Sequence, residues 1–264
     1  MAVKYVNVNT KIRGMYAKVF KDEDYEELLR QNSEYASLIL LKSKEEYEKY
    51  LKDLDSNIHR GELEKILQQS LIKDIQQISL LLDQKGKRYF KVLESKYIDE
   101  DAAYNNKLLY LYTKKYLRSD KDVLELIGTK IDVLNILSIY RAKKYYNLSK
   151  DKTMDKLIKV NYKIPKEIIT KLCDQSNAMD LFKILEETKY GQIFISDNEE
   201  QMEKNAKQYL YRTYKKHLRQ DLHKFSNILA YVFLREIEIE NIINIIEGTR
   251  YGQDMAVTRN RIVM

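Results

Sequence analysis

The scarcity of proline and glycine constrains this chain more than any other feature of its sequence. Its 264 residues include one proline and seven glycines, well below the roughly 5% and 7% of average proteins. Hairpins and tight strand turns depend on these residues, because glycine reaches positive φ and proline fixes the first corner of a turn. The sequence therefore predicts an all-α fold whose helices end mainly at side-chain caps.

The charge pattern favours ordered, amphipathic helices. Charged residues make up 33% of the chain and hydrophobic residues 44%, a balance unlike that of disordered chains. Acidic and basic residues alternate, as in residues 44–49 (KEEYEK), which is typical of solvated helix faces. The formal net charge of +7 would suit an acidic partner, an anionic membrane surface or nucleic acid.

Cysteine content and hydropathy indicate the cellular compartment expected for the chain. Cys173 is the only cysteine, so neither an intrachain disulfide nor a cysteine-based zinc site can form, and a reducing cytoplasm is expected. The first residues lack the apolar core of a signal peptide. The longest apolar stretch, residues 225–234, is about half of the ~20 residues that a membrane span needs. We expect a soluble chain.

Caps and apolar periodicity predict the helices. We expect them over residues 2–18, 22–42 with a break near Asn32, 44–54, 60–83, 87–118 with breaks, 120–147, 152–159, 165–187 with a break near Gln175, and 198–247. Two capping boxes, at residues 43–46 (SKEE) and 196–199 (SDNE), predict helix starts. No linker divides the chain, so a single all-helical domain over residues 1–264 is expected.

An internal repeat is the most informative pattern. Residues 131–146 (IDVLNILSIYRAKKYY) match residues 237–252 (IEIENIINIIEGTRYG) at a constant offset. Apolar residues in each copy recur at the spacing of one helix wall: Val133, Ile136, Leu137 and Tyr140, and Ile239, Ile242, Ile243 and Ile246. A weaker third copy, in which Asn7 keeps its spacing to Arg13, opens the chain. The repeat helices lie near residues 3–16, 129–146 and 235–252.

A second element follows two of these copies. Residues 24–39 and residues 165–182 both read as a helix, a polar break and another helix. For the copy at the start of the chain, the general resemblance among amphipathic helices is an equally good explanation. The match between residues 131–146 and 237–252 is too long for that explanation.

The repeated segments also carry a family resemblance. Residues 128–146 and 230–252, supported by Tyr5–Val6–Asn7 and residues 185–191 (LEETKYG), resemble the C-type subunits of vacuolar-type rotary ATPases in bacteria and archaea, called d-type subunits in eukaryotes. The resemblance implies a funnel of three similar helical bundles in a pseudo-threefold arrangement. The funnel would be seated on the membrane rotor ring and would receive the central stalk (D- and F-type subunits) in its mouth.

The same resemblance implies a role. The chain would be a non-catalytic rotor subunit, without a cofactor and without a homo-oligomer, at the cytoplasmic face of the membrane. It would couple ATP hydrolysis or synthesis to proton or sodium ion transport. Members of the family are usually longer, and the stretch between about Lys42 and Arg88 is too short for a full middle repeat, so a shortened member is expected.

The glycine pattern indicates no nucleotide site. Gly86–Lys87 has no glycine upstream at phosphate-loop spacing, so no nucleotide site is predicted. The spacing of Gly248 and Gly252 could indicate close helix packing, but their position near a helix end favours chain-turning roles.

Histidine and cysteine likewise indicate structural roles. The three histidines, His59, His217 and His223, include no pair at the spacing of metal ligands on one helix face, so no metal site is predicted. His59 is expected at a helix start. Cys173 is expected in the core.

The repeated polar positions are the candidate functional residues. Asn135 and Asn241 fall within apolar helices, where an amide is costly unless it is hydrogen-bonded, so each is expected to bond a neighbouring helix and fix its packing. Charged positions that recur after them could line the funnel or its ring-facing end, although a solvated face is an equally good explanation. These are Arg141, Lys144, Glu247 and Arg250.

The 22 tyrosines raise a rival hypothesis. Tyrosine and lysine alternate in residues 110–116 and 209–216, which could stack single-stranded nucleic acid. Against it, Tyr110, Lys114 and Leu117 share a helix face, and 40 acidic residues nearly balance 47 basic ones. No nucleic acid partner is expected. The alternative function is a free-standing basic helical adaptor or nucleic-acid-binding protein.

Overall fold

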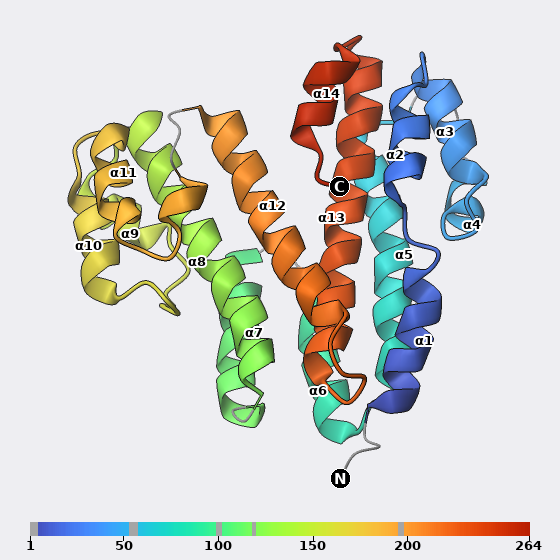
Figure 1. Cartoon of the computed structure of the whole chain (residues 1–264), viewed down its shortest axis with the longest axis horizontal. Coiled ribbons are helices and arrows are strands. Elements are labelled where there is room, and N and C mark those ends of the chain that lie inside the picture. Colours follow the sequence, from blue (N-terminus) through green and yellow to red (C-terminus); the bar gives the residue numbers. More distant parts are fainter. Residues whose placement is uncertain (1–4, 53–57, 99–101, 118–119, 195–197) are drawn as a thin grey trace. The chain divides into compact units, whose positions relative to one another are not determined.

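The protein is built from helices that gather into two compact units. The computed structural model describes residues 5–52, 58–98, 102–117, 120–194 and 198–264, and no strand occurs among them. This confirms the all-α prediction. Unit 1 comprises Met1–Tyr97 and Tyr214–Met264, and unit 2 comprises Ile98–Thr213 (Figure 1). The single domain and the three-bundle funnel stay predictions.

Unit 1 is organised around one long helix, α13 (Phe225–Arg250). Its other helices are α1 (Val6–Tyr16), α2 (Asp22–Leu29), α3 (Glu34–Lys42), α4 (Glu48–Leu51), α5 (Arg60–Leu80), α6 (Gln84–Ser95) and α14 (Met255–Arg261). α13 packs against α1, α2, α3, α5 and α14 (Figure 1). Buried residues occur on all its sides from Phe225 to Gly248, as expected for a helix enclosed by others.

Unit 2 is organised around α8 (Lys121–Lys144). The remaining elements of this unit are α7 (Ala102–Tyr116), α9 (Lys150–Asp155), α10 (Lys166–Asp174), α11 (Ala178–Glu186) and a short 3-10 helix, η1 (Gly191–Ile193). The core of unit 2 joins Ile136 and Tyr140 of α8 to Leu172 of α10 and Leu185 of α11. The chain returns to unit 1 within α12 (Glu199–Leu218).

The predicted apolar walls are confirmed in both long helices. In α8, Val133, Ile136 and Tyr140 are buried, and Leu137 is partly buried against the same core. In α13, the four isoleucines of the wall, Ile239, Ile242, Ile243 and Ile246, are all buried. Burying each such side chain contributes about 1.5–3 kcal/mol, so these walls account for much of the packing energy of the two helices.

Side-chain caps start many of the helices, as the shortage of glycine and proline requires. The side chains of Ser33, Asp83, Asp120, Asn177 and Asp254 each accept a backbone N–H at a helix start. His59 does the same for α5 through Nδ1, which confirms its predicted place. The predicted breaks near Asn32 and Gln175 separate α2 from α3 and α10 from α11.

Several predicted helix boundaries are wrong. The single helix over 198–247 is two helices, because the Asn227 amide bonds the carbonyls of Gln220 and Asp221 (3.3 and 3.0 Å) and stabilises a turn after α12. Ser43 ends α3 by donating to the Leu40 carbonyl, so the helix expected over 44–54 is reduced to α4. The sequence pattern also missed α14. Ser196 of the second capping box lies outside the described residues.

The two glycines near the end of α13 have different roles. Gly252 has φ +59° and turns the chain, as predicted. Gly248 is inside α13, and a Cβ there would collide with the side chain of Thr258 in α14. The chain-turning role predicted for Gly248 is therefore wrong, because this glycine lets α13 and α14 approach closely. No helix in the described part of the chain is long and apolar enough to cross a membrane.

We predict that Gly248→Ala destabilises the chain by about 1 kcal/mol in urea unfolding. Alanine gains up to ~1 kcal/mol in helix propensity, but overpacking against Thr258 costs about 1–3 kcal/mol. Gly14→Ala is the matched control, since Gly14 lies in α1 with open space around its Cα, and it should stabilise. Equal stabilisation by both variants would contradict the packing role.

Candidate functional site

Asn135 and Asn241, the repeated asparagines of the two long helices, each hydrogen-bond a segment that follows a short helix. In unit 2, Asn135 donates to the Ile158 carbonyl (3.0 Å) and accepts the Ile158 N–H (2.9 Å). In unit 1, Asn241 donates to the Val263 carbonyl (2.7 Å) and accepts the Val263 N–H (3.2 Å). Ile158 follows α9 and Val263 follows α14, so each asparagine bonds the segment after a short helix and not, as was expected, a helix itself. The same amide-to-peptide pairing recurs in both units. Figure 1 shows the C-terminal end lying against the middle of α13.

A buried acid precedes each asparagine by three residues. Asp132 accepts the N–H groups of Tyr162 and Lys163 (3.2 and 2.8 Å) and the Tyr190 hydroxyl (2.9 Å). These partners flank α10 and α11, so one carboxylate ties both ends of that helix pair to α8. Burial raises the pKa of Asp132, and the hydrogen bonds to Lys163, Tyr190 and Tyr162 oppose the shift.

Unit 1 uses Glu238 in the same way. This carboxylate accepts the Phe20 N–H (3.2 Å) and the Tyr47 hydroxyl (3.1 Å), and these partners flank the α2–α3 pair. The acid is the second residue of both repeat copies, residues 131–146 and 237–252, but no role was predicted for it. The signal for this role was an acidic residue on the apolar helix face in both copies of the repeat.

In the weaker copy of the repeat, at the start of the chain, the buried asparagine lies two residues after Asn7. Asn7 is exposed, whereas Asn9 is buried and donates to the carbonyls of Leu222 and Lys224. Asn9 therefore makes the kind of backbone contact that was expected from the repeat. Arg13 is exposed.

The repeated charged positions differ between the units. In unit 2, Arg141 pairs with Glu203 at the surface, and Lys144 donates to the Tyr140 hydroxyl. In unit 1, Arg250 is largely buried between Glu247 and Glu34 and also donates to the Ile58 carbonyl. The solvated-face explanation thus fits Arg141, while Glu247 and Arg250 join α13 to α3 and to the segment before α5.

The most elaborate polar cluster surrounds Arg235, which sequence reasoning did not identify. Its guanidinium is 0% exposed and pairs with Glu238 Oε2 (2.5 Å) and Asp74 Oδ2 (3.3 Å). It also donates to the hydroxyls of Tyr47 (2.9 Å) and Ser70 (3.0 Å). Burial opposes the charge, but Glu238 and the other partners outweigh it and hold the pKa of Arg235 above its ordinary value.

This Arg235 cluster joins three parts of unit 1. Arg235 and Glu238 come from α13, Ser70 and Asp74 from α5, and Tyr47 from the segment before α4. The Tyr231 hydroxyl donates to Asp74 as well (2.7 Å). The missed signal was an arginine with two nearby glutamates directly after the apolar run that opens α13.

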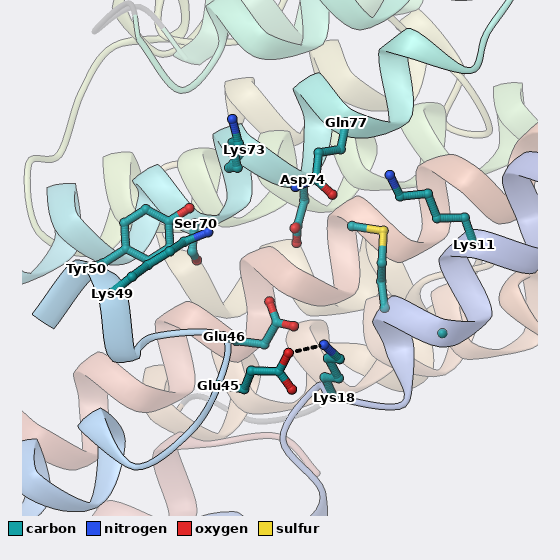
Figure 2. Close-up of a pocket in the computed structure, with 12 residues that line it drawn as sticks. Lys11, Lys18, Glu45, Glu46, Lys49, Tyr50, Ser70, Lys73, Asp74 and Gln77 are labelled. Atoms are coloured by element: carbon teal, nitrogen blue, oxygen red, sulfur yellow. Dashed lines mark hydrogen bonds and ion pairs between the residues drawn. The ribbon is translucent and has the colours of Figure 1, made fainter.

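A pocket of about 450 Å³ borders the cluster. Figure 2 shows Asp74 and Glu46 directed toward its interior, with Lys73 directed away and Lys18 paired to Glu45. Burial raises the pKa of Glu46, Arg235 opposes the shift and Asp74 adds to it. The described residues of its walls combine lysines with carboxylates, an arrangement suited to polar contacts.

Cys173 has the structural role expected for it. The side chain is fully buried in the core of unit 2. Burial raises the pKa of the thiol to about 11, against the opposing influence of Lys143 and Lys150. The thiol is therefore protonated at neutral pH and is a poor nucleophile.

We predict that Asn241→Leu destabilises the chain by about 1–3 kcal/mol, because it leaves the buried N–H and C=O of Val263 without partners. Amide hydrogen exchange at Val263 should accelerate. Asn7→Leu is the control: its side chain is exposed, so its effect should stay within ~0.5 kcal/mol. Unchanged exchange at Val263 in the Asn241 variant would show that the pairing does not hold this segment.

We also predict that Arg235→Met costs about 3–5 kcal/mol in urea unfolding, since it leaves Asp74 and Glu238 buried without a cation. Arg141→Met removes an arginine whose ion pair is at the surface, and should cost no more than ~1 kcal/mol. Similar losses in the two variants would contradict the dominant role of the buried cluster.

Comparison with models of known protein families tests the resemblance found in the sequence. A family model described as ATP synthase (C/AC39) subunit matches residues 8–102 and 98–261. The two matched segments overlap at residues 98–102, close to Ile98, where unit 2 begins. No curated protein matches the chain. The family match covers nearly the whole chain and confirms the resemblance to the C-type subunits, so this chain belongs to the family of ATP synthase (C/AC39) subunits.

Proposed function

We propose that the chain is a non-catalytic coupling subunit of a vacuolar-type rotary ATPase, joining the central stalk to the membrane rotor ring. The observation that carries the proposal is the family match over residues 8–102 and 98–261. In this role the chain works at the cytoplasmic face of the membrane. It passes torque between ATP hydrolysis or synthesis and the movement of protons or sodium ions.

The polar clusters support a mechanical role because torque transmission requires a body that resists deformation. Glu238 and Arg235 tie α13 to α5, to the segment before α2 and to Tyr47. Asp132 ties α8 to both ends of the α10–α11 pair. Sliding any of these helices would leave a buried charge or N–H without a partner, at a cost of about 1–3 kcal/mol for each neutral group and more for each charge.

The nucleic-acid hypothesis loses support from the packing of the tyrosines. Tyr110 is buried and donates to the Asn161 carbonyl (3.4 Å), and Tyr214 is buried against Phe233. The rings of Tyr112 and Tyr116 pack on each other at 4.4 Å. The buried rings of Tyr110 and Tyr214 serve internal packing, whereas a stacking platform needs exposed faces; of the four rings only Tyr116 is exposed.

The test is to purify the tagged chain from membranes in mild detergent and to identify the co-purifying proteins. We expect rotor-ring and central-stalk subunits, and we expect ATP hydrolysis to lose its coupling to ion transport when the chain is absent. Arg235→Met, which weakens unit 1, should reduce recovery of the complex, whereas the matched Arg141→Met should not.

Two results would overturn the proposal. One is a chain recovered alone, or with nucleic acid in a salt-sensitive complex. The other is a rotary complex that keeps its stalk, its ring and its coupling without the chain.

A further inference from the structure

The turn between α5 and α6 exposes two leucines. Leu80 is 75% exposed and Leu81 is 47% exposed, and Leu80 is the most exposed large apolar side chain in the described part of the chain. The turn itself is well defined, because Leu82 is buried and Asp83 accepts the Gly86 N–H (2.8 Å) to start α6. The leucines therefore project from a fixed apex.

Basic side chains follow these leucines along α6. Residues 80–93 contain four basic residues and one acidic residue. The four, Lys85, Lys87, Arg88 and Lys91, are all exposed, and none forms an ion pair within the residues that the structure describes. The opposite face of α6 is buried through Tyr89, Phe90 and Leu93. One side of the helix is thus anchored in unit 1, and the other is a patch of positive charge.

Aromatic packing places this turn at a defined end of unit 1. The Phe225 ring packs on Tyr89 and Phe90 of α6 at 5.4 and 6.0 Å, and on Tyr5 before α1 at 5.5 Å. The starts of α1 and α13 therefore meet the middle of α6 at one end of unit 1, which Figure 1 shows opposite α14. The exposed Arg219, in the turn before α13, adds a positive charge there.

We propose that residues 80–91, the α5–α6 tip, insert into the headgroup region of a membrane surface that contains anionic lipid. The leucines leave water on insertion, and the basic residues gain from the negative surface potential. A convex apolar apex with basic flanks needs no matching cavity in a lipid surface. An acidic protein partner would have to supply an apolar socket. The inference goes beyond the coupling role and does not require it.

The test uses the purified chain with vesicles of phosphatidylcholine, with and without phosphatidylserine, in a sedimentation assay. We expect binding to the anionic vesicles alone, weakened by added salt. Lys87→Glu/Arg88→Glu should lower the partition coefficient at least ~10-fold. Lys152→Glu/Lys156→Glu changes the net charge equally at exposed sites of unit 2, and should bind as the unmodified chain does.

A fluorescent reporter tests insertion of the apex directly. The chain contains no tryptophan, so Leu80→Trp introduces a single tryptophan at the tip, which can be excited at a longer wavelength than the 22 tyrosines absorb. Its emission should shift to shorter wavelength with anionic vesicles, and brominated lipid should quench it. Ile39→Trp is the control, because Ile39 is 49% exposed on α3, away from the tip, and its emission should not change.

The proposal is wrong if the chain ignores anionic vesicles, if both charge variants bind equally, or if Leu80→Trp does not shift. Loss of binding to a detergent-solubilised rotor ring through Lys87→Glu/Arg88→Glu, without any vesicle binding, would instead identify an acidic protein partner. Since the vesicle assay contains no other subunit, a negative result would leave the proposed coupling role standing.

Discussion

Unit 1 depends on satisfying one fully buried positive charge, that of Arg235. A helix enclosed on all sides by apolar neighbours can carry a guanidinium only if other segments bring acids and hydroxyls to it. Asp74 and Ser70 of α5 and Tyr47 before α4 meet this requirement. Because an apolar core of similar volume can be equally stable, we interpret the cluster as a device that selects one arrangement of α13, α5 and the α2–α3 pair.

The shortage of glycine and proline explains why similar devices recur. Irregular segments here are held by side chains of the long helices instead of by turn-forming residues. Asp132 and Glu238 bind N–H groups at the start of a helix pair and a tyrosine beyond it. Asn135 and Asn241 pair with a peptide group after a short helix. Each long helix therefore fixes the ends of the segments around it, which gives both units a rigid interior suited to a mechanical part.

The surface of unit 1 has a different character from its interior. Most lysines and arginines along the chain are interleaved with acids, which leaves little net field. The α5–α6 tip departs from this pattern, because its basic residues pair with no acid among the described residues and lie beside two exposed leucines. Exposed leucines and neighbouring like charges do not stabilise the folded chain. The physical advantage of this combination therefore lies in contact with another surface.

The sequence by itself determined the helical class and the apolar walls of α8 and α13, because these follow from composition and local spacing. Its motifs also resembled those of the family, and the polar positions within apolar helices predicted hydrogen bonds for Asn135 and Asn241. Tertiary structure decided the rest. Arg235 and its partners in α5 lie more than 150 residues apart, and no periodicity links such distant positions. The local pattern indicated a helix end at Gly248, but this glycine lies inside α13, where Thr258 of α14 packs against it. Asn7 keeps the repeat spacing to Arg13, and only the position of residues 222–224 beside α1 shows that Asn9 makes the backbone contact. Spacing within a helix shows which face is buried, but only the tertiary structure shows which distant residues contact that face.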